Sequence, residues 1–400
     1  MAPNRARSSV FHSAVFCRSV TDNSSNIAMA SQSQNRRLVA TRKLRGASHL
    51  KFHEIDTPAL LLDLDAMERN LAKMARFFRT GHTRLRPHYK NHKCPALARR
   101  QMDTGAIGMT CATFAEAEAL VSNGITDILI SSELAGDRKI ERFVELARKA
   151  DVKAVVDNAT AVAAIAAAGR AKGCRLSVLV NVNVGQNRTG IKPGGPAVEL
   201  ARKVVAEGLR FRGLMGYEGH VAHQMEGPEK ESAYDLAMGT LMKSRSLLED
   251  SGIAVEIVST GGTGTHHLSP RFPAITEFQA GSYLVMDTEY TKTCKDFDRA
   301  LTVLGTVISK TEGERVVVDA GLKSISGEHG IPVVKSCAGV RLRQLNAEHG
   351  IIDILDSSVA LEVGDIIEIW VHYSDATVNL HECMYGIRNG EVEEILRLKG

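Results

Sequence analysis

Apolar runs of strand length alternate with amphipathic stretches between residues 85 and 285. Eight runs have the character of buried strands: Leu85–Lys90, Gly108–Thr113, Asp127–Ser132, Lys153–Asp157, Leu176–Asn183, Phe211–Tyr217, Glu256–Gly261 and Glu277–Tyr283. Stretches with a helical period lie between most of them: Pro95–Gln101, Ala115–Ser122, Lys139–Lys149, Ala159–Ala171, Ala197–Glu207 and Tyr234–Glu249. Such alternation is typical of parallel strands joined by crossover helices. Because eight units occur within about 200 residues, the pattern predicts a (β/α)8 barrel.

The pattern changes at residue 300, where β-forming runs follow one another with little helical periodicity. These runs are Leu301–Ile308, Arg315–Asp319, Ala338–Leu342 and Ile366–Trp370. They predict a second, antiparallel β domain. For the first part of the chain a doubly wound sheet is the alternative. No Gly-x-Gly-x-x-Gly motif follows the first strand, which disfavours a dinucleotide-binding version of that sheet.

The predicted domains are an α/β barrel over residues 65–295 and a β domain over residues 296–400. Residues 51–64 include the apolar run Ala59–Leu64, which we expect to join the β domain as an N-terminal strand. Of the whole chain, 44% of the residues are hydrophobic and 24% charged, an ordinary globular composition. No apolar run approaches the roughly 20 residues of a membrane helix, so we expect no membrane span. Seven cysteines without a Cys-x-x-Cys pair argue against a disulfide framework.

Positive charge is concentrated in residues 1–50, which hold eight Lys or Arg and one acidic residue, Asp22. The remaining residues hold 42 basic and 45 acidic side chains, so nothing suggests nucleic-acid binding. A first segment that is rich in Arg and Ser and nearly free of acids is typical of a transit peptide. We therefore expect an organelle, either mitochondrion or chloroplast. A disordered basic tail on a cytoplasmic protein is the alternative.

Lys90 ends the first predicted barrel strand, within Arg86-Pro87-His88-Tyr89-Lys90. Functional groups of such barrels cluster at the carboxyl ends of the strands. A lysine there can form an imine with an aldehyde cofactor if its amine is partly desolvated. Taken alone, a surface lysine is the simpler interpretation, because lysines are mostly exposed.

Glycine-rich loops follow the seventh and eighth predicted strands. Glycines let backbone N–H groups approach a phosphate, and hydroxyl groups add further donors. Loops in these two positions form the common phosphate site of this barrel. The residues that we expect to bind a phosphate-bearing cofactor are Thr260, Gly262, Thr263, Gly281, Ser282 and Tyr283. After the sixth strand, His220 and His223 are candidate acid–base groups, although a lone histidine is more often structural.

Several motifs occur together in one order: Asp56-Thr57-Pro58-Ala59-Leu60, then Arg-Pro-His-x-Lys-x-His-Lys from Arg86, then Thr377-Val378-Asn379. With these motifs, residues 54–390 resemble the family that holds D-threonine aldolases and eukaryotic-type D-serine dehydratases. These are fold-type III pyridoxal-phosphate enzymes, related in fold to alanine racemase. The resemblance implies that Lys90, and not Lys93, carries the cofactor.

The resemblance also implies roles for two residues at strand ends. It places Arg188 against the phenolic oxygen of the cofactor, where a guanidinium favours the ionised phenolate. It aligns Tyr217 with a residue that packs on the pyridine ring, for which an aromatic face is suited. A surface ion pair for Arg188 and a buried core position for Tyr217 are the alternatives.

The segment from His372 to Asn379 resembles the metal motif of the family. It suggests His372 and Asp375 as ligands of a divalent ion. In the family one residue separates the two ligands, whereas two separate them here. Asp375 keeps its register with Thr377-Val378-Asn379, so His372 is the ligand that departs from the family spacing. A local bulge in the backbone could turn its side chain toward the ion. The nearby His381-Glu382-Cys383 follows the motif and is not taken as a ligand.

The ligand type favours one reaction of the family. A carboxylate with an imidazole suits Mg²⁺ or Mn²⁺, whereas the cysteine of the dehydratases suits Zn²⁺. The resemblance therefore implies a metal-dependent lyase that cleaves D-threonine and other D-3-hydroxy amino acids to glycine and an aldehyde. The base would be His220 or a metal-bound water or hydroxide. Homodimerisation is also expected from the resemblance.

Three other activities are weighed against this one. A zinc-dependent D-serine or D-threonine dehydratase uses the same scaffold. A non-catalytic pyridoxal-phosphate-binding protein would resemble a lone barrel, and residues 300–400 argue against it. A racemase is disfavoured, because a pair of metal ligands serves no purpose in a reaction that only removes and returns an α-proton.

Overall fold

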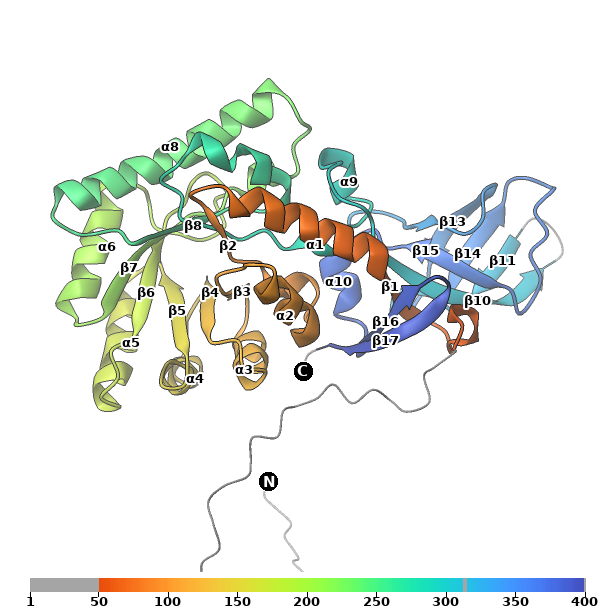
Figure 1. Ribbon diagram of the computed structural model, residues 1–400, viewed down its shortest axis with the longest axis horizontal. Helices are drawn as coiled ribbons and strands as arrows, with labels where there is room; N and C mark the ends of the chain where they lie inside the picture. Colours follow the sequence, from red (N-terminus) through yellow and green to blue (C-terminus); the bar gives the residue numbers. More distant parts are fainter. Residues whose placement is uncertain (1–49, 312–314, 399–400) are drawn as a thin grey trace, which may run out of the picture. The chain divides into compact units, whose positions relative to one another are not determined.

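The computed structural model describes residues 50–311 and 315–398 (Figure 1). The transit-peptide prediction falls on residues 1–50 and, except for Leu50, lies outside the described residues. Within the part of the chain that is described, no helix is long and apolar enough to cross a membrane.

Eight parallel strands within the described residues form one curled sheet, in the order β2-β9-β8-β7-β6-β5-β4-β3. The two ends of this sheet meet, because His88 forms a parallel bridge with Thr110 and the Ile107 amide donates to the Leu85 carbonyl at 3.0 Å. The predicted barrel is therefore confirmed, and a doubly wound sheet, with strands running both ways from an inner first strand, is wrong. The strands are β2 (Arg84–Leu85), β3 (Met109–Cys111), β4 (Asp127–Glu133), β5 (Asp151–Val156), β6 (Ser177–Asn181), β7 (Arg210–Met215), β8 (Ile257–Thr260) and β9 (Glu277–Phe278).

The barrel strands are apolar on both faces, which is why they are nearly continuous hydrophobic runs in the sequence. One side chain from each of five strands fills the inside of the barrel: Leu129, Val155, Leu179, Met215 and Ile257. Their sequence neighbours, such as Ile128 and Ile130, belong to the larger core under the helices. Alternation along each strand thus separates the interior from the helical layer.

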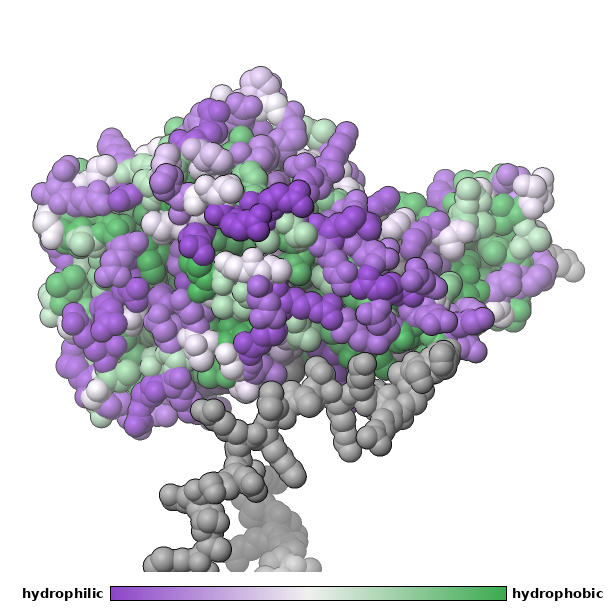
Figure 2. All heavy atoms as spheres, viewed as in Figure 1, coloured by the Kyte–Doolittle hydropathy of each residue, from purple (hydrophilic) through white to green (hydrophobic). Residues whose placement is uncertain are grey.

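The helical layer consists of α1 (Leu64–Arg79), α2 (Pro95–Asp103), α3 (Phe114–Ser122), α4 (Asp137–Ala147), α5 (Ala159–Ala171), α6 (Gly195–Ala206) and α8 (Pro228–Asp250). Helix α1 begins after Asp63, whose carboxylate accepts from the Ala66 amide at 2.9 Å. Hydrophilic residues dominate the surface over this helix in Figure 2. The helices therefore bury an apolar side against the barrel and keep a charged side in water.

A second sheet follows the barrel in the chain. It has the order β13-β14-β11-β10-β1-β16-β17 among the described residues, and β15 pairs with both β10 and β12. All pairings are antiparallel except that of β1 with β16. The strands are β1 (Ala59–Asp63), β10 (Leu301–Thr311), β11 (Arg315–Val318), β12 (Val333–Val334), β13 (Val340–Leu345), β14 (Gly350–Ile354), β15 (Ile366–Trp370), β16 (Cys383–Arg388) and β17 (Glu391–Arg397).

Short helices at the carboxyl ends of the barrel strands form the remaining structure. They are η2 (Tyr89–Asn91), α7 (Gly219–Ala222), η3 (Thr263–Arg271), η4 (Ser282–Leu284) and α9 (Tyr290–Thr293). The β domain contributes α10 (Ser374–Val378), and η1 (Phe52–Glu54) precedes β1. Asn91 in η2 donates to the Ser374 hydroxyl at 2.8 Å, so α10 is bound to the rim of the barrel.

Candidate active site

Lys90 lies in η2, beyond the end of the first barrel strand. The sequence pattern predicts a strand that runs to Lys90, but β2 ends at Leu85. Pro87 has no N–H group to donate to a neighbouring strand, so regular pairing stops and only His88 returns to a bridge. The Lys90 Nζ atom lies 2.8 Å from Oδ2 of Asp375 in α10.

Lys90 and Asp375 form an ion pair across the two domains. Burial lowers the pKa of the Lys90 amine, but the Asp375 carboxylate outweighs burial and raises that pKa to about 12. Burial also raises the pKa of Asp375, and the Lys90 charge with hydrogen bonds from Lys90 and Asn91 brings it below its usual value. The Lys90 side chain remains 45% exposed, so a small molecule can reach the amine.

A chain of hydrogen bonds fixes Asp375 in place. The Asn91 amide donates to Asp375 Oδ1 at 2.7 Å. Ser374 donates to Asp287 Oδ2 twice, from its backbone amide at 2.9 Å and from its hydroxyl at 2.8 Å. Because Asn91 and Asp287 both belong to the barrel rim, α10 is positioned by the barrel rather than by its own sheet.

His372 belongs to a different network from Asp375. Its Nδ1 lies 2.5 Å from the Thr288 hydroxyl, and its Nε2 lies 3.0 Å from the His329 carbonyl oxygen and 3.3 Å from Glu289 Oε2. The structure therefore does not bring the two predicted metal ligands onto one point. Tyr373 occupies the position two residues before Asp375. Burial raises the pKa of its phenol, and the charge of Asp375 raises it further.

Arg188 and Tyr217 come together at the ends of β6 and β7. The Arg188 guanidinium carbon lies 5.8 Å from the centre of the Tyr217 ring. Burial raises the pKa of the Tyr217 phenol, while the charges of Lys90 and Arg188 act to lower it. A small hollow of about 20 Å³ beside them is lined by these two residues and by Ser131 and Asn181, among others. The three predicted residues Lys90, Arg188 and Tyr217 thus share one region.

The two glycine-rich loops also meet in this region. Helix η3 begins after Gly262 and η4 begins after Gly281, so the first N–H groups of each helix have no carbonyl partner within their own helix and are suited to bind an anion. A Cβ on Gly281 would lie 2.8 Å from the His88 carbonyl oxygen, and a Cβ on Gly262 would lie 3.4 Å from the Tyr217 ring. Glycine is needed at position 281 because the backbone approaches His88 closely, whereas a Cβ on Gly262 would make an ordinary van der Waals contact.

The side chains of the predicted phosphate loops have different surroundings. The Thr260 hydroxyl donates to Glu218 at 2.8 Å, and the Tyr283 hydroxyl accepts from the Gln101 amide at 2.8 Å. The Thr263 hydroxyl accepts from the Tyr283 amide at 2.9 Å and links the two loops. Ser282 is half-buried beside the Tyr290 phenol. Thr260 and Tyr283 therefore direct their hydroxyls into the protein.

Glu218, which sequence reasoning missed, organises the first of these loops. Its buried carboxylate accepts from the Thr265 hydroxyl at 2.6 Å, the Thr260 hydroxyl at 2.8 Å and the Gly261 amide at 3.2 Å. Burial raises the pKa of this carboxyl group, and these hydrogen bonds oppose that shift. The only signal in the sequence is an acidic residue directly after Tyr217 at a buried strand end.

The two candidate acid–base histidines, His220 and His223, differ in their contacts. His220 is exposed, and a Cβ on Gly185, in the loop after β6, would lie 3.0 Å from its Nε2. His223 packs on the Tyr290 ring with 4.5 Å between ring centres, and burial lowers its pKa. The ring of His220 thus lies next to the loop that carries Arg188.

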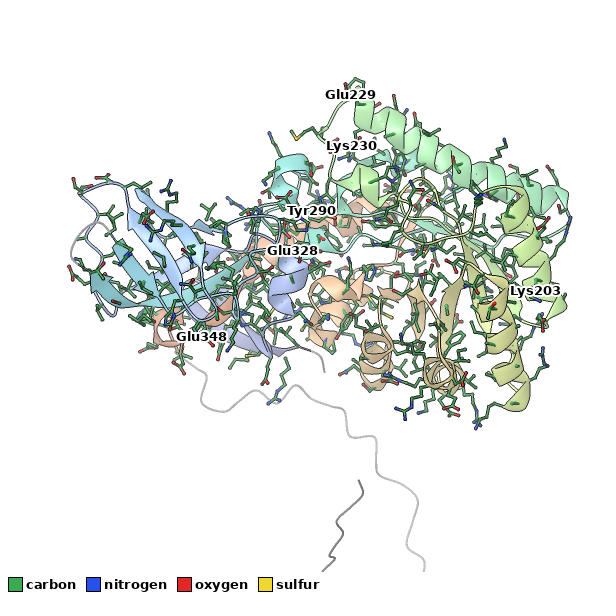
Figure 3. All side chains as sticks on the ribbon, turned by 180° about the vertical axis from the view of Figure 1, so that it is seen from behind. Lys203, Glu229, Lys230, Tyr290, Glu328 and Glu348 are labelled. Atoms are coloured by element: carbon green, nitrogen blue, oxygen red, sulfur yellow. The ribbon has the colours of Figure 1, made fainter. Side chains whose placement is uncertain are left out.

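Two further residues belong to the site without having been predicted. Tyr290 (labelled in Figure 3) is buried. Burial raises the pKa of its phenol, followed by Tyr217 and then by the charges of Asp375 and Asp287. His88 lies 3.3 Å from the Ser131 hydroxyl, and burial, followed by the Lys90 charge, lowers its pKa to about 3. His88 is therefore a neutral imidazole beside the lysine.

This arrangement fits pyridoxal phosphate. The accessible amine of Lys90 suits the aldehyde of this cofactor. The Tyr217 ring and the Arg188 guanidinium suit its pyridine ring and its phenolate. The two helices that begin after glycines suit its phosphate. For a divalent ion, Asp375 offers a carboxylate in the same region, while His372 as oriented does not complete a pair. The donor set for the metal therefore fits only in part.

Comparison with known proteins shows the family of this chain. Residues 62–289 match the family model described as "Alanine racemase, N-terminal domain", and residues 300–387 match "Putative serine dehydratase domain". The chain is 37% identical to D-threonine aldolase of Arthrobacter sp, over 85% of this chain and 91% of that protein. It is 33% identical to 3-hydroxy-D-aspartate aldolase of Paracoccus denitrificans (strain Pd 1222), over 86% of this chain and 91% of the relative.

A solved structure gives the same result for the fold. The crystal structure of D-threonine aldolase from Filomicrobium marinum superimposes with a TM-score of 0.85 at 37% sequence identity. The match covers 88% of this chain and 98% of that chain. The chain therefore belongs to the D-threonine aldolase and D-serine dehydratase family of alanine-racemase-like enzymes, for which pyridoxal phosphate is the expected cofactor.

Proposed function

We propose that this chain is a lyase that cleaves D-threonine and other D-3-hydroxy amino acids by a retro-aldol reaction. The products are glycine and an aldehyde, which is acetaldehyde for D-threonine. The observation that carries the proposal is the Lys90–Asp375 pair, an amine and a hard carboxylate 2.8 Å apart at the mouth of the barrel. A carboxylate, rather than the thiolate of a dehydratase, stands next to the lysine.

In this proposal Lys90 holds pyridoxal phosphate through its amine. Arg188 faces the phenolic oxygen, and the Tyr217 ring supports the pyridine. Backbone N–H groups at Gly262, Thr263, Gly281 and Ser282 bind the phosphate, while Thr260 and Tyr283 shape the loops through Glu218 and Gln101. When bound, the cofactor supplies an electron sink for the electron pair released at Cα.

In this proposal, groups at the site then accept the proton of the substrate β-hydroxyl. For the Cα–Cβ bond to break, the β-hydroxyl must lose its proton, and its electron pair becomes the carbonyl bond of the aldehyde. In our proposal His220 accepts this proton, which is supported by its exposed ring beside Gly185, in the loop that carries Arg188. A water held at Asp375 is the alternative base. Protonation at Cα afterwards gives glycine.

We propose Mg²⁺ or Mn²⁺ as the ion associated with Asp375, because carboxylate oxygens suit hard cations. Zn²⁺ is the expectation for a softer site. His372 can act as the second ligand only if its ring leaves Thr288 and the His329 carbonyl. The ion would lower the pKa of the β-hydroxyl and so assist the loss of its proton.

Product analysis tests the proposal. The purified protein with pyridoxal phosphate and D-threonine should release glycine and acetaldehyde, more rapidly with Mg²⁺ or Mn²⁺ and less with EDTA. 2-Oxobutyrate with ammonia would instead establish a dehydratase. Binding of the cofactor without any turnover would establish a cofactor carrier.

The assembly and the location of the protein are separate proposals. We propose a homodimer, as the family resemblance implies, and exposed apolar side chains of the β domain such as Leu322, Val333 and Leu355 are candidates for its interface. Light scattering of the purified protein should give twice the 43.3 kDa chain mass. We propose residues 1–50 as an organelle signal, which fusion of this segment to a fluorescent protein would test.

A further inference from the structure

A second group of metal-ligating side chains lies behind the phosphate loop, apart from Asp375. It consists of His266 in η3, Cys294 at the end of α9 and Asp296 in the segment that leads to β10. One potential ligand atom from each lies within 4.8 Å of the others. His266 and Cys294 are buried, whereas Asp296 is exposed.

The hydrogen bonding of His266 directs a lone pair into this group. Its Nδ1 lies 2.8 Å from the Thr263 carbonyl oxygen, which can only accept, so Nδ1 carries the proton. Nε2 is then unprotonated and lies 3.9 Å from Asp296 Oδ2. Burial lowers the pKa of this imidazole to about 4, so the lone pair is available at neutral pH. Zinc-binding histidines usually donate their other nitrogen to a carbonyl in this way.

Cys294 supplies a soft ligand. Its Sγ atom faces the same Thr263 carbonyl at 4.0 Å, and burial raises the pKa of the thiol to about 11. Without a cation this residue is a neutral buried thiol. A divalent ion would release the thiol proton to solvent and bind the thiolate.

Asp296 divides its two carboxylate oxygens between different partners. Oδ1 lies 3.2 Å from the Lys73 ammonium, and Oδ2 faces His266. Lys73 is half-exposed and can move into water, so it competes with an ion but does not block it. The rings of Phe77 and Phe297, each centred 5.2 Å from that of His266, form an apolar wall around the imidazole.

We propose that His266, Cys294 and Asp296 form a binding site for zinc or another thiophilic divalent ion. A thiolate with an imidazole selects such ions over Mg²⁺. Ligand atoms of a tetrahedral zinc site lie about 3.3–3.8 Å apart, so the His266–Asp296 distance already approaches that of a formed site. Water would supply the fourth ligand at the exposed side of Asp296.

Bound metal at this site would act on the phosphate loop, the glycine-rich segment before η3 that we propose to bind the cofactor phosphate. His266 and Cys294 both approach the carbonyl of Thr263, whose hydroxyl links the two phosphate loops. Asp296 precedes β10, the first strand of the β domain after the barrel. The ion would therefore bind the phosphate loop to the connection between the domains, and its role would be structural.

Cobalt titration of the full-length holoprotein tests the site, because thiolate ligation to Co²⁺ gives a near-ultraviolet charge-transfer band. We expect this band in the wild type, in Cys337→Ser and in Asp375→Asn, with displacement by one equivalent of Zn²⁺. Cys294→Ser should lose the band and bind Zn²⁺ at least about a hundredfold more weakly. A wild-type protein without the band, or a band that survives in Cys294→Ser, would overturn the proposal.

A second variant tests the site without removing a ligand. Lys73→Met removes the ammonium that competes for Asp296, so Co²⁺ should bind more tightly while the band keeps its shape. Unchanged or weaker binding in Lys73→Met would also overturn the proposal, even if Cys294→Ser failed to fold.

Discussion

The Nζ atom of Lys90 lies 2.8 Å from Oδ2 of Asp375, although 284 other residues separate them in the chain. Lys90 follows a barrel strand, and Asp375 lies in the first turn of a short helix of the β domain. Asn91, next to Lys90, also donates to Asp375. The site is thus assembled from both domains, and neither domain alone contains it.

Lys90→Ala should abolish the visible absorbance of protein-bound pyridoxal phosphate and the lyase activity. Lys90→Arg is the matched variant, because it keeps a positive charge opposite Asp375 but cannot attach the cofactor. Lys93→Ala is the control, since Lys93 donates to Asn379 at 2.9 Å outside the ion pair. Absorbance that is retained in Lys90→Ala and lost in Lys93→Ala would assign the cofactor to Lys93.

Asp375→Ala should lose the stimulation of activity by Mg²⁺ or Mn²⁺, and Asp375→Cys should shift the preference toward Zn²⁺, because a thiolate is softer. His372→Gln should lose less of the stimulation, since both ring nitrogens bond to Thr288, His329 and Glu289. Activity measured across a metal titration separates these variants. Equal losses in His372→Gln and Asp375→Ala would mean that the imidazole turns to the ion.

Tyr373 stands where the spacing of the family motif places a histidine. Tyr373→His would put an imidazole two residues before Asp375, and we expect it to bind Mn²⁺ more tightly than the wild type. Calorimetric titration with Mn²⁺ measures this directly, and Tyr373→Phe serves as the control for loss of the phenol. No gain in Tyr373→His would show that the register of α10 does not direct this position toward Asp375.

The fold was predictable because the barrel strands are buried on both faces and the helices between them are amphipathic. Pattern alone also predicted Ile366–Trp370 as a strand, as observed in β15. It missed β14 and β16, which alternate buried and half-buried residues over only five and six positions. Short strands with one partly exposed face give a weak periodic signal. The first predicted barrel strand was extended too far, because the regular strand β2 ends at Leu85 and only His88 forms a further bridge.

The candidate site was predictable only where a residue carries a motif. Lys90 and Asp375 were named because of the family resemblance, and no periodicity could place them together. Asp287 and Tyr290 lie in a segment without strand or helix pattern and act through contacts with distant residues. His372 was predicted as a metal ligand from its residue type and its nearly correct spacing. Its ring instead bonds to Thr288 and the His329 carbonyl, apart from Asp375.

Glu218→Gln should weaken binding of pyridoxal phosphate. The carboxylate accepts from three donors of the loop before η3, and an amide can satisfy fewer of them. Loss of hydrogen bonds to a charged acceptor costs about 1.5–3 kcal/mol, so the dissociation constant should rise about ten- to a hundredfold. Fluorescence titration of the apoprotein measures it, with Glu226→Gln, a surface carboxylate beside Lys230, as the control. Unaltered affinity in Glu218→Gln would remove this residue from the support of the loop.

His92 makes folding sensitive to acid. The Cys94 amide donates to Nδ1 at 3.1 Å, so the proton sits on Nε2, which donates to Gln101. Burial lowers the pKa of this imidazole to about 4, below about 6.5 in the unfolded chain. Between these values the unfolded chain binds more protons, so stability is lost as the pH falls from 6.5 to 4, by roughly 3 kcal/mol. In His92→Asn the free energy of unfolding, measured by urea denaturation across this range, should fall less steeply; an identical slope would assign the acid sensitivity to other groups.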